Sequence, residues 1–201
     1  LNLTTRSIAE SGEGMVEVGL GDNGYRKLHG YYSDSLVFNG KAFGWLVEGL
    51  STGADGFKEI DNAQHSLYDV DSGFDKQDLL AKVNYRFDGT LFGVPSEHYL
   101  ELKLSVSEED SNETYLGLTD VDFDATPYRR YAATQVGNMN WQHEQLMLTY
   151  NLSNDDINWT TRLYNNRFER AWRKVNGFYQ QGTATPTLQE ILAQPEQDEH
   201  T

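Results

Sequence analysis

The sequence predicts an all-β chain: an antiparallel meander of about seven long strands that forms part of a large, incomplete transmembrane β-barrel. The first observation is strict alternation of apolar and polar residues, which is clearest in residues 79–87 and 100–106. Successive side chains of a strand point to opposite faces, so each of these segments has one apolar and one polar face. The second observation is that long polar connections separate the segments. A barrel with an apolar exterior and a wet interior combines both features.

Composition limits the classes of function. The 201 residues carry a net charge of −15 at neutral pH. This argues against a nucleic-acid partner, because phosphate groups require a basic surface. The absence of cysteine excludes thiolate metal sites and disulfides. The mean hydropathy is −0.65, and no run approaches the ~18 apolar residues of a spanning helix. Half of every barrel strand is polar, so neither result argues against a membrane barrel.

Two turn signals place the first three strands. Residues 22–24 (Asp-Asn-Gly) and 39–40 (Asn-Gly) suit tight turns, because Asn and Gly adopt positive φ at little cost. The first strand precedes 22–24, the second runs from about 25 to 37, and the third begins at Lys41 and ends through 53–57. The apolar faces of the first and third strands carry Val16, Val18, Leu20, Phe43, Trp45 and Val47.

Alternation places the other four strands at about 79–87, 100–106, 146–152 and 157–163. A turn near Asp88-Gly89, extended to Pro95, joins the first pair, and Asn154–Asp156 joins the last pair. Three long connections lie at one end of the sheet, at about 59–75, 108–140 and 173–201. Short turns at one end and long loops at the other are typical of bacterial outer-membrane barrels.

Aromatic side chains near the strand ends predict the interfacial girdle of such a barrel. They are Trp45, Tyr85, Phe87, Tyr99, Tyr150 and Trp159. The same pattern also fits a soluble antiparallel β-protein, because aromatic residues favour strands in general. Near the C-terminus, residues 187–192 are expected to form one or two helical turns between Pro186 and Pro195.

Four stretches, in this order and spacing, resemble one protein family. They are residues 1–6 (LNLTTR), 52–59 (TGADGFKE), 115–132 (containing YLGLTD and PYRRYA) and 165–174 (NNRFERAWRK). In these stretches the chain resembles the TonB-dependent outer-membrane receptors, and within them the ferric-citrate receptor group. The resemblance implies that residues 1–9 are the end of the plug domain and that residues 10–201 are the N-terminal portion of a barrel of roughly 22 strands. The chain would then be an internal fragment of a larger protein.

The long connection at 108–140 holds the first candidate ligand site. Ferric citrate is an anion rich in carboxylates, and guanidinium groups bind carboxylates in bidentate geometry. The resembling receptors use loop and lumen arginines in this way, which implies Arg129 and Arg130, with the adjacent Tyr128, as substrate-binding residues. The alternative is that these arginines pair with nearby aspartates and order the loop.

Arg170 is the second candidate for contact with an anionic ligand. If Leu163 faces lipid, the even-numbered residues of the last strand face the interior, so Arg170 points inward and Arg167 does not. Its alternative role is a salt bridge to a neighbouring strand.

No catalytic constellation is visible, and we expect neither enzymatic activity nor a resident metal or cofactor. Residues 120–124 (Asp-x-Asp-x-Asp) have the first half of a calcium-loop spacing, but Ala125 replaces the required Gly and Tyr131 the required Glu. A solvated acidic loop is the expected alternative. Five histidines fit no metal spacing: His29, His65, His98, His143 and His200.

The expected function is that of an outer-membrane receptor segment for TonB-dependent uptake of a ferric chelate, such as ferric citrate or a siderophore, in the bacterial outer membrane. The implied partners are the chelate, outer-membrane lipid and the TonB-type energy-coupling complex, which would act through the missing plug. One alternative is the same family with haem, cobalamin or a saccharide as cargo. A haem receptor is expected to carry a loop histidine ligand, and the long loop has none before His143. The other alternative is a soluble β-sandwich that binds a ligand at its loop tips.

Overall fold

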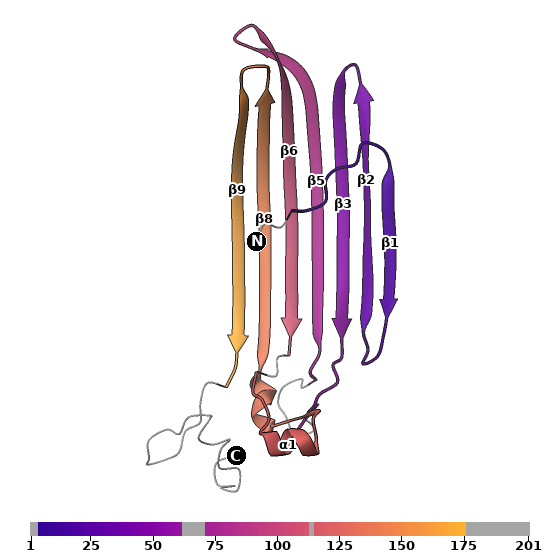
Figure 1. Ribbon diagram of the computed structural model, residues 1–201, viewed down its shortest axis with the longest axis vertical. Helices are drawn as coiled ribbons and strands as arrows, with labels where there is room; N and C mark the ends of the chain where they lie inside the picture. Colours follow the sequence, from indigo (N-terminus) through magenta and orange to yellow (C-terminus); the bar gives the residue numbers. More distant parts are fainter. Residues whose placement is uncertain (1–3, 62–70, 113–114, 176–201) are drawn as a thin grey trace, which may run out of the picture.

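The computed structural model describes residues 4–61, 71–112 and 115–175 (Figure 1). Seven antiparallel strands form one sheet, with each strand beside its neighbour in the chain, which confirms the predicted all-β meander. The strands are β1 (Glu13–Leu20), β2 (Arg26–Phe38), β3 (Lys41–Ala54), β5 (Phe74–Leu91), β6 (Val94–Ser111), β8 (Asn138–Ser153) and β9 (Asn158–Arg173). The sheet is not closed, and its two edges are β1 and β9.

The two ends of the sheet differ as the sequence predicts. Short turns join β2 to β3, β5 to β6 and β8 to β9 at one end, called here the turn end (Figure 1). At the opposite loop end lie the β1–β2 turn and the long connections. These contain the two-residue strands β4 (Glu59–Ile60) and β7 (Arg129–Arg130), the helix α1 (Asp120–Ala125) and the 3₁₀ helix η2 (Ala132–Val136). Among the described residues, no helix has the length and hydrophobicity needed to cross a membrane.

One face of the sheet, called here the apolar face, is continuous across the strands. A typical row of register partners runs from β3 to β9 and consists of Trp45, Val83, Leu102, Leu148 and Leu163. The opposite polar face has, in a row three residues further along β3, Glu48, Leu80, Ser105, Gln145 and Asn166. The alternation in the sequence therefore predicts the two faces correctly.

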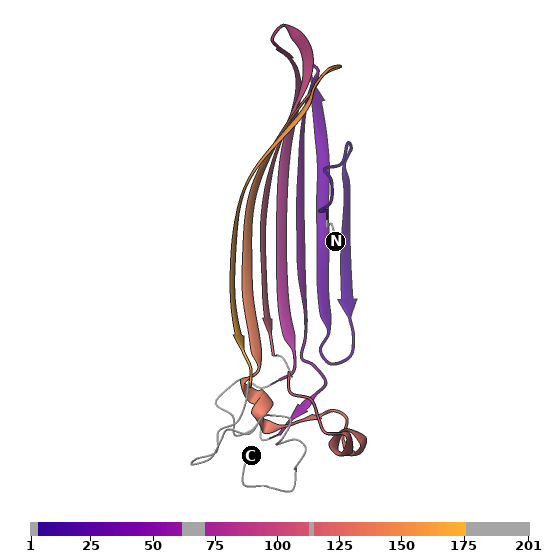
Figure 2. The ribbon, with the colours of Figure 1, turned by 60° about the vertical axis from the view of Figure 1, so that its left-hand side comes forward.

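The apolar face is open to its surroundings. Val16, Val18 and Leu20 are 76%, 68% and 84% exposed. Among the described residues, only four hydrophobic side chains are buried: Leu46, Leu80, Leu116 and Leu152. A β-sandwich packs two sheets about 10 Å apart with their apolar faces together. The described strands form a single layer instead (Figure 2).

Residues 4–12, called here the strap, cross the polar face without joining the sheet. The Ala9 N–H donates to Ser33 Oγ at 2.8 Å, and Lys82 Nζ donates to the Arg6 carbonyl at 2.6 Å. The sequence predicts a short β-like run at residues 1–8, and this is wrong for residues 4–8, which form no strand. The strap satisfies its backbone groups with side chains of the sheet and not with a backbone ladder.

The β5–β6 hairpin turns later than predicted. Its turn residues are Phe92 and Gly93, which both have positive φ. The observed turn lies inside the predicted connection from Asp88 to Pro95, but the turn signal at Asp88-Gly89 is wrong, because Asp88 pairs with Glu97 and Thr90 with Pro95. Phenylalanine rarely adopts positive φ, so Gly93 is the only conventional turn residue of this pair and the signal at Asp88-Gly89 looks stronger.

Polar residues extend the strands at the loop end beyond the predicted boundaries. The predicted connection at 108–140 begins only after Ser111 and ends before Asn138. Asp110 accepts hydrogen bonds from the side chains of Asn138 and Asn140 at 2.7 and 3.0 Å, which holds the ends of β6 and β8 together. The predicted helical turns at 187–192 lie outside the described residues, as does most of the loop expected at 173–201.

The predicted aromatic girdle is largely on the apolar face, near the turn end. Phe87 and His98 stack with ring centroids 4.8 Å apart, and His98 also stacks on Tyr150. Tyr99 is the exception, since it lies on the polar face, where its hydroxyl donates to Glu101 Oε2 at 2.6 Å. Its inclusion in the girdle was wrong, because it alternates with Leu100 along β6.

Candidate functional site

Arg129 joins two segments of the loop end that are far apart in the sequence. β4 and β7 pair in parallel, with Glu59 opposite Arg129. The Arg129 Nε donates to both carboxylate oxygens of Asp61, at 3.1 and 3.0 Å, and its Nη1 lies 3.2 Å from Asp122 Oδ1. The hydrogen bonds to Asp61 raise the pKa of the Arg129 guanidinium above its ordinary value. In this structure Arg129 therefore orders the loop, as the alternative interpretation expected.

Asp122 is the second residue that holds together the segments around β4, β7 and α1, called here the loop layer. Its Oδ2 accepts hydrogen bonds from the hydroxyls of Tyr131 and Thr119, at 2.5 and 2.9 Å. These bonds, together with the charge of Arg129, hold the pKa of Asp122 below its ordinary value of 3.8. Its oxygens thus accept hydrogen bonds from side chains of the loop. Within the described ranges, no group of three or more metal-ligating side chains occurs.

We expect acid to open this loop layer. Because the pKa of Asp122 is lowered by folding, the unfolded loop binds a proton at a higher pH than the folded loop. The stabilisation is complete at a pH above 3.8, the ordinary pKa of this carboxyl group, and it is lost as the pH falls through the lowered pKa of the folded loop. Hydrogen exchange of the Glu59 and Asp61 amides, corrected for intrinsic rates, should report the opening. Tyr131→Phe should move it to higher pH, and an unchanged midpoint would contradict the assignment.

Arg130 and Tyr128 remain available to a ligand. The Arg130 guanidinium donates to the carbonyl of Pro127 at 3.0 Å, and no carboxylate within the described ranges forms an ion pair with it. Tyr128 is exposed, and its ring meets that of Phe57 edge-on with centroids 5.7 Å apart. The role of these residues in anion binding stays a prediction.

Arg170 lies on the polar face, as the parity of β9 predicts. Its register partner is Trp141, and its guanidinium carbon lies 5.4 Å from the ring centroid of Trp172. Arg167 lies on the opposite face and pairs with Glu169. No contact within the described ranges joins Arg170 to Arg129 or Arg130, so the predicted site residues fall into two separate places.

Sequence reasoning missed an aromatic–cation cluster around Arg170. We define this cluster as Tyr115, Trp141, Phe168, Arg170, Trp172 and Lys174. The ammonium of Lys174 lies 4.5 Å from the ring centroid of Tyr115 and 4.3 Å from that of Trp172. The same parity that placed Arg170 also places Phe168 and Trp172 on the polar face, so the signal for most of this cluster was present in the sequence.

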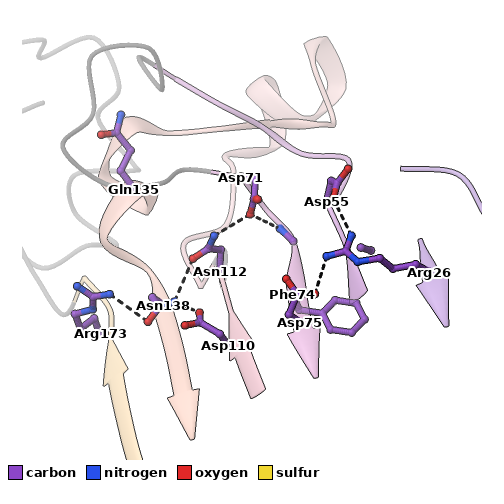
Figure 3. Close-up of a pocket in the computed structure, with 12 residues that line it drawn as sticks. Arg26, Asp55, Asp71, Phe74, Asp75, Asp110, Asn112, Gln135, Asn138 and Arg173 are labelled. Carbon is purple, nitrogen blue, oxygen red and sulfur yellow. Dashed lines mark hydrogen bonds and ion pairs between the residues drawn. The ribbon is translucent and has the colours of Figure 1, made fainter. Parts of the chain in front are cut away.

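A cavity of about 370 Å³ lies at the loop end on the other side of the sheet (Figure 3). Its lining lies on the same side of the sheet as the apolar face, nearer the loop end than the last apolar row. Most of the polar side chains there form hydrogen bonds or ion pairs with one another. Arg26 forms ion pairs with Asp55 and Asp75, at 3.1 and 2.6 Å. Arg173 donates to Asn138, which in turn donates to Asp110. Most polar groups of this cavity are therefore paired with one another, and Gln135 in its lining donates to the carbonyl of Asp61, the partner of Arg129.

Comparisons with protein-family models, with curated proteins and with solved structures gave no match for this chain.

Proposed function

We propose that this chain is part of a TonB-dependent receptor of the bacterial outer membrane that takes up a ferric chelate, such as ferric citrate or a siderophore. The observation that carries the proposal is the apolar face, which stays exposed across all seven strands. An exposed apolar surface of this extent is rare in a soluble monomer and indicates contact with a membrane or a partner. Contact with lipid would bury it without a second protein layer.

The height of the apolar band supports a place in a bilayer. On β5 the band extends from Leu79 to Phe87, eight residue steps or about 27 Å along the strand. At a strand tilt of about 40° this is about 21 Å along the membrane normal, close to the ~25 Å band of outer-membrane barrels. Towards the loop end the same face becomes polar at Gln77, Glu108 and Gln142, which are register partners. In a receptor, the polar loop-end parts of these strands would extend beyond the membrane into the external medium.

The strap supports a polar barrel interior that contains a plug. Its hydrogen bonds to Ser33, Ser35 and Lys82 fall on the polar face, where Ser33 is fully buried and Lys82 is 6% exposed. Arg6 lies over the ring of Tyr31 and 3.7 Å from Glu48. A lumen filled by residues that precede the barrel would require such contacts. The energy-coupling complex of the inner membrane would act through that plug.

Ferric-chelate binding is the direct test of the proposed cargo. The full-length receptor, in detergent, should bind at least one member of a panel of ferric citrate, a ferric hydroxamate and a ferric catecholate. Arg130→Ala should weaken binding of the anionic chelates by about tenfold or more, because a hydrogen bond to a charged group contributes about 1.5–3 kcal/mol. Isothermal titration measures the change, and Lys41→Ala, at the turn end, is the control. Binding of no chelate would refute the proposal.

Haem is the second candidate cargo. His143 lies on the polar face, where its ring packs edge-on against Phe168 at a centroid distance of 6.0 Å. It is thus a possible axial ligand beside the aromatic–cation cluster. A haem titration followed by optical absorption separates the two cargoes, since His143→Ala would abolish the haem spectrum and leave ferric-chelate binding intact.

A further inference from the structure

The aromatic–cation cluster contains exposed aromatic rings and lies at the loop end of β8 and β9. These two strands are neighbours in the sheet (Figure 1). Tyr115, Phe168 and Trp172 are 55%, 58% and 40% exposed. Tyr115 meets Trp172 edge-on at 6.1 Å, and Trp141 lies 6.1 Å from Phe168. Aromatic side chains carry large apolar areas and dominate the energetics of interfaces. Their concentration at one place therefore indicates a binding surface.

The cluster is also a local excess of positive charge on a chain of net charge −15. Within the described ranges, neither Arg170 nor Lys174 forms an ion pair with a carboxylate, and both lie over aromatic rings. A third cation, Lys76, lies 5.6 Å from the ring centroid of Trp141, with Asp78 at 3.7 Å. Glu109 is the nearest acidic register partner, on the far side of Trp141 from Arg170. The donors of Arg170 and Lys174 are thus open to an anion.

The position of these rings excludes a role in the lipid interface. Trp141, Phe168 and Trp172 alternate with residues of the apolar face and lie on the polar face, as the strap does. A further strand paired with β9 would extend the sheet in its own plane and would leave this face uncovered. In the proposed receptor the cluster therefore faces the interior at its external opening.

We propose that this cluster binds a ferric chelate whose anionic arms carry aromatic rings, such as catecholates. The inference rests on the proposed function and specifies its substrate class. Trp172 and Tyr115 already have cations over their rings and offer their exposed edges for edge-on contact with a ligand ring. Arg170 and Lys174 offer charged donors to phenolate and carboxylate oxygens. An aliphatic polycarboxylate such as citrate would use only the cations and leave the rings in water.

The wild-type receptor provides the first test. Full-length protein in detergent is titrated with ferric 2,3-dihydroxybenzoate and with ferric citrate, and quenching of tryptophan fluorescence reports binding. The dihydroxybenzoate complex should bind at least about tenfold more tightly, which corresponds to one or two ring contacts. Equal or tighter binding of ferric citrate would overturn the inference and leave the proposed function standing. If no ferric chelate binds, both fail.

Variants locate the contact on the structure. Trp172→Ala should weaken binding of the dihydroxybenzoate complex by about tenfold and change the affinity for ferric citrate by less than about twofold. Trp172→Phe should retain the wild-type affinity for the dihydroxybenzoate complex. Arg170→Gln should weaken both chelates, whereas Arg167→Gln, on the opposite face of the same strand, should weaken neither. Equal losses for both ligands in Trp172→Ala, or equal effects of the two arginine variants, would contradict the inference.

Discussion

If the apolar face contacts lipid as proposed, Leu148→Arg is expected to lower the free energy of unfolding of the lipid-reconstituted protein by about 2–4 kcal/mol, the cost of an arginine near the midplane of a bilayer. Leu148 lies in the central row of the apolar band, between Leu102 and Leu163. An arginine there has no polar neighbour within its row. Equilibrium unfolding of the receptor in lipid vesicles, followed by tryptophan fluorescence against denaturant, measures the loss.

Gln145→Arg is the matched control, on the same strand but on the polar face. Its register partners are Ser105 and Asn166, so the new charge meets neutral polar side chains. We expect a change of less than about 1 kcal/mol, as is usual for a surface substitution. A loss in Leu148→Arg no larger than that in Gln145→Arg would contradict the assignment of the apolar face to lipid. So would purification of the isolated chain, without detergent, as a soluble monomer that melts cooperatively.

The faces of the sheet were predictable because the signal is local. A period of two residues fixes the side of every residue in a strand once one residue is placed, which is why Arg170 and Arg167 were assigned correctly. Tyr99 was misplaced because it was chosen for its nearness to a strand end and not for its parity. The strap was misread because its partners, Ser33 and Lys82, are distant in the sequence.

The loop layer, and the approach of Trp141 and Tyr115 to β9, depend on contacts that no local pattern encodes. Asp61 binds Arg129 across 68 residues, and only the meeting of β4 and β7 makes that pairing visible. The sequence left two roles open for Arg129, and the structure places it between two carboxylates. Trp141 and Tyr115 approach β9 from other parts of the chain, whereas Phe168 and Trp172 share the parity of Arg170 on β9 and were predictable beside it.

Gly44→Val is expected to displace the strap from the polar face. A β-carbon at Gly44 would lie 2.7 Å from Ile8 Cγ2 and 2.7 Å from Asn84 Oδ1, so the strap or the sheet must move. Overpacking of this kind costs about 1–3 kcal/mol, and moving the strap relieves it at the expense of the Ala9–Ser33 hydrogen bond. Exchange of the amides of residues 4–12 should then accelerate by about one to two orders of magnitude, measured by hydrogen–deuterium exchange and mass spectrometry.

Gly49→Val tests whether this effect belongs to the strap or to β3 in general. Gly49 lies on the apolar face of the same strand, and a β-carbon there meets only the carbonyl of Asp78, at 4.0 Å. The strap amides should exchange at the wild-type rate in this variant. If both variants accelerate exchange equally, or if neither does, the strap is not held by its packing against Gly44. A selective effect of Gly44→Val would show that the polar face holds the strap through close packing, as the wall of a plugged barrel must.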